Sequence, residues 1–310
     1  MILVLTIIIS FRSTSLFFQW VGLEINILAI IPILINQGSL KKTLSSVKYF
    51  ISQSPASIIL VASLFTWDYL TVSPIIFQLS IFFKLALPPF HGWLVSILFD
   101  LDYRAIFMNF SVQKFIPLII LSQININLNL FTISSILIVF ILLNLINLIS
   151  SFHYLIFLSS LTNIYWLLAT LSYNNIWLNF ILIYTLIVGL ALLCLSNEGL
   201  NKMLDLTKIN LSGILLISLQ FMNLGGIPPL LGFFLKLLII KFIVEIKIIV
   251  IFPIIFITII LLFSYVSLIY QIFCINLNRR VGITFSSAMN VNIFVSIIII
   301  TPSFILLFLV

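Results

Sequence analysis

Residues 82–93 read Phe-Phe-Lys-Leu-Ala-Leu-Pro-Pro-Phe-His-Gly-Trp, and residues 224–236 read Leu-Gly-Gly-Ile-Pro-Pro-Leu-Leu-Gly-Phe-Phe-Leu-Lys. Each stretch sets a Pro-Pro pair and one lysine inside a long apolar run. Because proline removes a backbone donor and clashes with the preceding helical turn, each run predicts a broken helix. Within a membrane, broken helices survive only where they line a polar cavity or are buried in protein. Such breaks in both halves of a membrane chain indicate an ion pathway built on an internal repeat.

The composition predicts an all-α integral membrane protein. The chain has 310 residues, of which 63% are hydrophobic and 7% are charged, whereas soluble domains carry about 25% charged residues. The net charge of +7 comes mainly from basic residues in predicted loops. Nucleic-acid binding is excluded because it requires a dense basic face, which the sequence lacks. No cleavable signal is expected, because Met1 leads directly into apolar residues without a basic stretch.

A helix that crosses a bilayer needs about 20 apolar residues. On this basis, polar breaks divide the chain into about eleven spans, of which the first is short. The fourth and ninth spans hold the two Pro-Pro pairs. They lie five apart, and since five is odd, two successive five-helix units must have opposite topology, as in many transporters. We predict a first repeat at 1–123, a second at 124–275, and a loop with a C-terminal helix at 276–310. The spans are predicted near 1–12, 16–36, 45–67, 71–99, 104–123, 129–150, 153–172, 175–196, 207–242, 247–275 and 290–309.

Basic loop residues predict the orientation in the membrane. Predicted loops after even-numbered spans hold eight of them, and loops after odd-numbered spans hold three. This bias places the even-numbered loops and the N-terminus in the inner compartment and the C-terminus outside. The eight are Lys41, Lys42, Lys48, Arg104, Lys202, Lys208, Arg279 and Arg280, and the three are Arg12, Lys241 and Lys247.

Four ionisable residues fall within predicted spans: Glu24, Lys84, Lys114 and Lys236. Each costs about 2.5–3.5 kcal/mol at mid-bilayer on insertion scales. We therefore expect them to face one another, or water, inside the bundle. Burial disfavours the charged form of a lysine and a nearby carboxylate favours it, so such groups can exchange protons. The alternative for the lysines is that some extend to the membrane interface.

Other polar residues within the spans carry weaker signals. His91 follows the first break, where its imidazole could relay protons or cap a broken helix end. No Gly-rich nucleotide loop, CxxC, iron–sulfur spacing or haem-type histidine pair is present, so we predict no cofactor or metal site and no electron transfer in this chain. The remaining polar residues are predicted to form interhelical hydrogen bonds or to hold water, and they are Asn26, Gln53, Gln113, Thr162, Asn163 and Tyr184.

Further motifs accompany the two breaks. Residues 20–26 read Trp-Val-Gly-Leu-Glu-Ile-Asn, with Ile-Pro at 31–32, and Gln-Lys stands at 113–114. Together with Lys-Tyr-Phe at 48–50 followed by Gln53, they resemble, in the same order, the motifs of mitochondrial NADH dehydrogenase subunit 2 of respiratory complex I. The lysine at position 236 favours this family over subunit 4, and the short C-terminus argues against subunit 5.

The resemblance implies an antiporter-like bundle, shortened at its N-terminus. It also implies proton transfer by Glu24 and Lys84 as a coupled pair, by Lys114 at the centre and by Lys236 toward the exit. The implied location is the mitochondrial inner membrane, with the N-terminus in the matrix and the C-terminus in the intermembrane space. Implied partners are other membrane-arm subunits, supernumerary subunits and lipids such as cardiolipin. NADH, FMN, iron–sulfur clusters and ubiquinone would bind elsewhere in the parent complex.

The chain departs from the family pattern at two places, and two other functions stay open. His153-Tyr154 stands where the family usually has a basic pair, and Asn163 stands where a histidine is common. A free-standing cation/proton antiporter would share the fold but would need a carboxylate cluster, whereas Glu24 is the only carboxylate well inside a predicted span. A structural subunit that pumps nothing would not need four buried ionisable groups.

Overall fold

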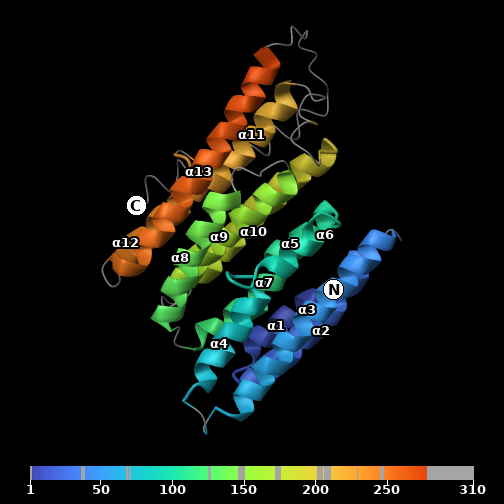
Figure 1. Ribbon diagram of the computed structural model, residues 1–310, viewed down its shortest axis with the longest axis vertical. Coiled ribbons are helices and arrows are strands. Elements are labelled where there is room, and N and C mark those ends of the chain that lie inside the picture. Colours follow the sequence, from blue (N-terminus) through green and yellow to red (C-terminus); the bar gives the residue numbers. More distant parts are fainter. Residues whose placement is uncertain are drawn as a thin grey trace. The chain divides into compact units, whose positions relative to one another are not determined.

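The computed structural model describes residues 2–35, 39–67, 69, 71–124, 127–145, 151–171, 176–200, 205, 211–228, 230–244 and 248–277 (Figure 1). Every regular element in these ranges is a helix, which confirms the all-α class. The helix predicted at 290–309 lies outside the described residues. Five described helices are long and apolar enough to cross a membrane: Leu16–Ile35, Leu40–Phe65, Tyr103–Ser122, Phe152–Thr170 and Ile176–Asn197.

The chain divides into two compact units. The first comprises Met1–Ile138 with Leu171–Asn174, and the second comprises Val139–Thr170 with Asn175–Val310. The helices that lie wholly in the first unit are α1 (Ile2–Arg12), α2 (Leu16–Ile35), α3 (Leu40–Phe65), α4 (Ser73–Lys84), α5 (Gly92–Leu98), α6 (Tyr103–Phe107), the π-helical turn η1 (Met108–Val112) and α7 (Gln113–Ser122). Within this unit, α3 packs on α2, α4 and α5, and α7 packs on α1, α2 and α4.

Helix α2 shows why these segments form membrane helices. Leu23, Ile27 and Ile30 recur at helical spacing and are buried against neighbouring helices. Ile25 and Leu28 point the other way, and both are exposed. A helix that is apolar on every side fits an environment in which its outer face meets lipid.

The first predicted break lies between α4 and α5. Helix α4 ends at Lys84, and the Leu87 N–H donates to the Phe82 carbonyl oxygen at 3.0 Å. The Ala86 N–H donates to the carbonyl oxygen of Phe83 at 3.0 Å, which completes a Schellman motif. Ala86 is left-handed, with a φ of 57°, although that conformation costs a residue with a Cβ about 1–2 kcal/mol. The prolines that follow prevent the helix from continuing.

The second unit is built around a central helix. The boundary between the units falls within α8 (Leu128–Leu145). Helix α9 (Phe152–Thr170) is buried along nearly its whole length. The other helices of this unit are α10 (Ile176–Asn197), α11 (Leu211–Gly225), α12 (Leu231–Val244) and α13 (Ile248–Leu277). Helix α9 packs on α10, α12 and α13, which accounts for its burial (Figure 1).

The second predicted break lies between α11 and α12 and repeats the backbone pattern of the first. The Ile227 N–H donates to the Met222 carbonyl oxygen at 3.2 Å, and the Gly226 N–H donates to that of Asn223 at 3.1 Å. Gly226 is left-handed, with a φ of 81°, a conformation that glycine adopts readily. Ala86 and Gly226 each stand two residues before the first proline of their pair. Both breaks therefore close the first half-helix in the same way.

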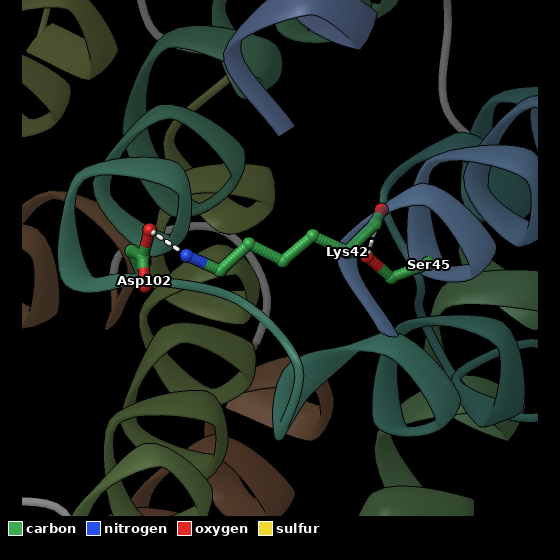
Figure 2. Close-up of polar contacts among 3 residues, drawn as sticks. All are labelled: Lys42, Ser45 and Asp102. Carbon is green, nitrogen blue, oxygen red and sulfur yellow. Dashed lines mark hydrogen bonds and ion pairs between the residues drawn. The ribbon is translucent and has the colours of Figure 1, made fainter. Parts of the chain in front are cut away.

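Helix α3 begins earlier than predicted. It starts at Leu40, so the lysines expected in the preceding loop lie in its first turns. A lysine interrupts an apolar run in the sequence, but it has a high helix propensity and does not end a helix. Its long side chain can reach polar groups beyond the helix. The Lys42 ammonium pairs with the Asp102 carboxylate at 2.6 Å, while the Ser45 hydroxyl donates to the Lys42 carbonyl oxygen (Figure 2). This ion pair joins the start of α3 to the start of α6.

Two other predicted spans start within one residue of the expected position, and each has a feature that the sequence did not indicate. The span predicted at 104–123 is continuous, but it contains the π-helical turn η1 between α6 and α7. Helix α9 begins at Phe152, within one residue of the predicted start at 153. His153 stands at this helix end but is buried within the second unit at 7% exposure, because neighbouring helices pack on α9.

Candidate functional site

The first break holds Lys84 beside a small polar cavity. Lys84 is the last residue of α4 and is 9% exposed. The cavity measures about 20 Å³, which is room for one water molecule. Its polar lining comes from four elements of the first unit and consists of Tyr49, Gln53, Lys84, Asn109, Gln113 and Lys114.

Lys114 meets Lys84 at this cavity. It stands on α7, is 4% exposed, and its ammonium lies 5.6 Å from the centroid of the Phe110 ring. The neighbouring side chain of Gln113 accepts a hydrogen bond from the Tyr49 hydroxyl at 3.2 Å and another from the Asn26 amide at 3.4 Å. Helices α2 and α3 thus hold the first turn of α7 in place, and the structure brings two of the predicted lysines to one cavity.

Several buried polar atoms around this cavity make no hydrogen bond to the described part of the chain. They are the Lys84 Nζ, both amide atoms of Asn109 and the Nε2 of Gln113. Each unmade hydrogen bond of a buried group costs about 1–3 kcal/mol. A water molecule in the cavity would satisfy several of them together. Sequence reasoning missed Asn109, whose only signal is its place one helical turn before Gln113.

Glu24 lies near Lys84 without touching it. Its side chain is half-buried on α2, and one of its carboxylate oxygens is buried without a hydrogen-bond partner among the described residues. The carboxylate is close enough to interact electrostatically with both Lys84 and Tyr49. In the part of the chain that the structure describes, however, no ion pair joins Glu24 to Lys84. Their direct coupling therefore stays a prediction.

His91 occupies the N-cap position of α5 but makes no side-chain capping bond there. The imidazole is half-buried, and its Nδ1 has no hydrogen-bond partner within the described ranges. His91 is also not among the residues that line the Lys84 cavity. The capping role is absent from this structure, and the relay role stays a prediction.

The second break holds Lys236 differently. This lysine stands on α12, after the break, and is 9% exposed. Its ammonium donates to the carbonyl oxygens of Gly225 at 2.5 Å and Leu224 at 3.5 Å, at the end of α11. These terminal carbonyls have no partner within their own helix and carry partial negative charge, so they favour a cation. A cavity of about 10 Å³ lies beside it, with polar lining from Asn163, Tyr184, Asn223 and Lys236.

Two glycines let the half-helices of the second break approach closely. A Cβ added to Gly226 would lie 3.0 Å from the Lys236 Nζ. A Cβ added to Gly232 would collide with the Asn223 carbonyl oxygen. Lys236 can therefore lie against the end of α11 only because Gly226 and Gly232 have no side chains.

We expect Gly232→Ala to disrupt the second break, because its methyl group would overlap the backbone of α11. The amount of assembled protein on a native gel should fall several-fold. Gly92→Ala is the matched control, since Gly92 holds the same place after the first Pro-Pro pair and an added Cβ there meets nothing within 4 Å. Equal loss in both variants would contradict this account of the break.

Comparison with solved structures defines the class of protein. The chain superposes with a TM-score of 0.78 on a chain of respiratory complex I from Thermus thermophilus, at 17% identity over 97% of this chain and 76% of that one. The TM-score is 0.81 for the archaeal membrane-bound sulfane sulfur reductase, at 14% identity over 97% and 71%. For the Mrp complex from Dietzia it is 0.69, at 16% identity over 92% and 60%. The chain shares its fold with a chain of each of these complexes, and it is a multi-pass membrane protein.

Sequence relatives narrow the class to one family. No family model matches the chain. It is 31% identical over 289 residues to NADH-ubiquinone oxidoreductase chain 2 of Anopheles gambiae, covering 88% of this chain and 84% of the relative. It is 32% identical over 252 residues to the protein of the same name from Mus musculus, covering 75% and 72%. The chain belongs to the NADH-ubiquinone oxidoreductase chain 2 family.

Proposed function

We propose that this chain is a proton-translocating membrane-arm subunit of NADH-ubiquinone oxidoreductase, in which Glu24, Lys84, Lys114 and Lys236 transfer the protons. The observation that carries the proposal is the pair of buried lysines, Lys84 and Lys114, at one polar cavity. Two ammonium groups in a membrane helix bundle together cost several kcal/mol. A purely structural subunit would have no reason to keep them, whereas proton transfer requires them.

The chemistry follows from the placement of the charges. A proton on Lys84 disfavours one on Lys114 across the small cavity, so only one of them is readily charged at a time. Movement of Glu24 toward Lys84 would favour the charged form of Lys84, and movement away would release its proton toward Lys114 through water. Lys236 would receive its proton against the carbonyls of α11, which stabilise the ammonium. The proposal places these four residues in a row at mid-membrane depth.

The energy would come from other subunits. NADH, FMN, the iron–sulfur clusters and ubiquinone belong to those subunits in this proposal, and we assign no cofactor or metal to this chain. The enzyme activity is therefore that of the whole complex, to which this chain contributes proton transfer without redox chemistry.

The proposed architecture is a pair of inverted five-helix repeats at 1–123 and 124–275, followed by a C-terminal helix within 276–310, with about eleven spans in all. The shared backbone pattern of the two breaks supports it. The proposed location is the mitochondrial inner membrane, with the N-terminus in the matrix and the C-terminus in the intermembrane space. Other membrane-arm subunits, supernumerary subunits and lipids such as cardiolipin would surround the chain.

Native gel electrophoresis of solubilised membranes tests this function. We expect the chain to comigrate with NADH dehydrogenase activity, and its loss to remove NADH-driven proton translocation. A chain that migrates alone and exchanges sodium for protons without NADH would instead be an antiporter. Comigration together with an unchanged proton yield in the Lys84→Met and Lys114→Met variants would point to a structural subunit.

A further inference from the structure

We infer that Asn223 is a positioning residue for Lys236. Its side chain ties the end of α11 to the first turn of α12 and so sets where the Lys236 ammonium meets the α11 carbonyls. The inference rests on the proposed function, because it concerns the same lysine.

Asn223 holds both sides of the second break. It is 2% exposed and stands near the end of α11. Its side-chain Oδ1 accepts a hydrogen bond from the Gly232 N–H at 3.0 Å. That N–H lies in the first turn of α12, where backbone donors have no partner within the helix. The main-chain oxygen of Asn223 also accepts from the Gly226 N–H at 3.1 Å. One residue therefore closes α11 and anchors the start of α12.

The hydrogen bond from Gly232 to Asn223 fixes the position of the Lys236 ammonium through the geometry of α12. Lys236 follows Gly232 by four residues, so the two lie on the same face of the helix, one turn apart. The Lys236 ammonium returns to the carbonyl oxygens of Leu224 and Gly225, the two residues directly after Asn223. These contacts form a closed ring from α11 to α12 and back. A shift at the Gly232 anchor must therefore move the ammonium relative to the carbonyls.

At the first break, a different hydrogen bond connects the two half-helices. There the residue in the place of Asn223 is Phe83, and its carbonyl oxygen accepts a hydrogen bond from the Trp93 indole at 3.1 Å. Lys84 precedes that break and is carried by α4 itself, so it needs no anchor across the turn. The amide anchor is specific to the break whose lysine stands on the second half-helix.

The side-chain amide nitrogen of Asn223 can donate a hydrogen bond to a water molecule. The Nδ2 atom is buried and makes no hydrogen bond to the described residues. Asn223 also lines the cavity of about 10 Å³ beside Lys236, a volume near the minimum for one water molecule. The amide can thus anchor α12 with its oxygen and offer its nitrogen to a water molecule next to the ammonium.

The test compares variants of the whole complex in sealed vesicles, with three readouts: the amount of assembled complex, the rate of NADH oxidation and the protons moved per NADH. Asn223→Leu keeps the size of the side chain and removes the acceptor. We expect proton transfer at Lys236 to slow roughly 10- to 100-fold, as for a reacting group displaced by about 1 Å, which lowers the proton yield per NADH while the complex still assembles.

Gln220→Leu is the matched control. Gln220 is a buried amide on the same helix at 3% exposure, but it does not line the Lys236 cavity. Its replacement should leave the proton yield unchanged. An equal fall in both variants would show that any buried amide of α11 matters, and the positioning role of Asn223 would be wrong.

Asn223→Ala keeps the inference testable if the leucine variant does not assemble. Alanine removes the acceptor for Gly232 without placing apolar bulk in the cavity beside Lys236, so the assembled complex should show the same fall in proton yield per NADH. A normal yield in this variant would overturn the inference. Lys236→Met separates the two proposals: if it lowers the yield while the assembled Asn223 variants do not, only the positioning role fails. If Lys236→Met itself leaves the yield unchanged, the proposed function fails at Lys236.

Discussion

Lys114→Met is expected to stop proton transfer through the first unit without preventing assembly. Methionine keeps much of the bulk of lysine beside Phe110 and removes the ammonium. A positioned proton-transfer group accelerates its step roughly 10²–10⁴-fold, so its loss should remove this subunit's share of the protons moved per NADH. Proton yield per NADH in vesicles measures the effect, and the amount of complex on a native gel measures assembly.

Lys41→Met is the control for the loss of one positive charge. Lys41 is exposed at the start of α3, away from the cavity lining. We expect the same proton yield as in the unmodified protein. An unchanged yield in Lys114→Met as well would exclude Lys114 from the proton path.

Glu24→Gln and Lys84→Met should each lower proton yield more than assembly. Glu24→Gln removes the counter-charge that favours the ammonium form of Lys84, and no other carboxylate stands in the predicted spans of the first unit. Removing one partner of a buried pair leaves the other charge uncompensated, which costs about 3–5 kcal/mol when the pair is in contact. We therefore expect the pair to close, directly or through one water molecule, in a second state of the protein.

A double-mutant cycle measures this coupling. The combined variant Glu24→Gln with Lys84→Met should lose less proton yield than the two single losses added together, because contacting residues deviate from additivity by about 0.5–3 kcal/mol. Glu24→Gln with Lys236→Met provides the comparison, and no comparable deviation is expected there. Strict additivity for Glu24 and Lys84 would show that they act independently.

The two helix breaks and the membrane character were predictable because each depends on local chemistry. The Pro-Pro pairs remove backbone donors at fixed positions, and α4 and α11 end before them as expected. The early start of α3 was not predictable from hydropathy, because lysines mark the end of an apolar run but do not end a helix. The left-handed Ala86 was also unexpected, since nothing in its own side chain favours that conformation.

The candidate site was predictable at its charged residues and at some of its uncharged polar residues. Gln53, Gln113, Asn163 and Tyr184 were expected to form hydrogen bonds or hold water, and they line the two cavities. Lys84, Lys114 and Lys236 are conspicuous inside apolar runs, and all three are buried. Asn109 and Asn223 are uncharged amides, which are common in membrane helices, and the sequence contains no signal that separates them from ordinary hydrogen-bonding residues. Their importance appears only when the cavities beside the lysines are seen.

The sequence by itself determined that this chain lies in a membrane, that its helices are broken near Pro88 and Pro228 and that three lysines must be buried inside the protein. These conclusions rest on composition, on the backbone donor that proline lacks and on the cost of a charge in lipid. None of these depends on which residues become neighbours in the folded chain. The tertiary structure alone decided that Lys84 and Lys114 share one cavity, and that Asn223 reaches Gly232 across the second break. Those contacts depend on how closely helices pack, and that distance is set by side chains far apart in the sequence.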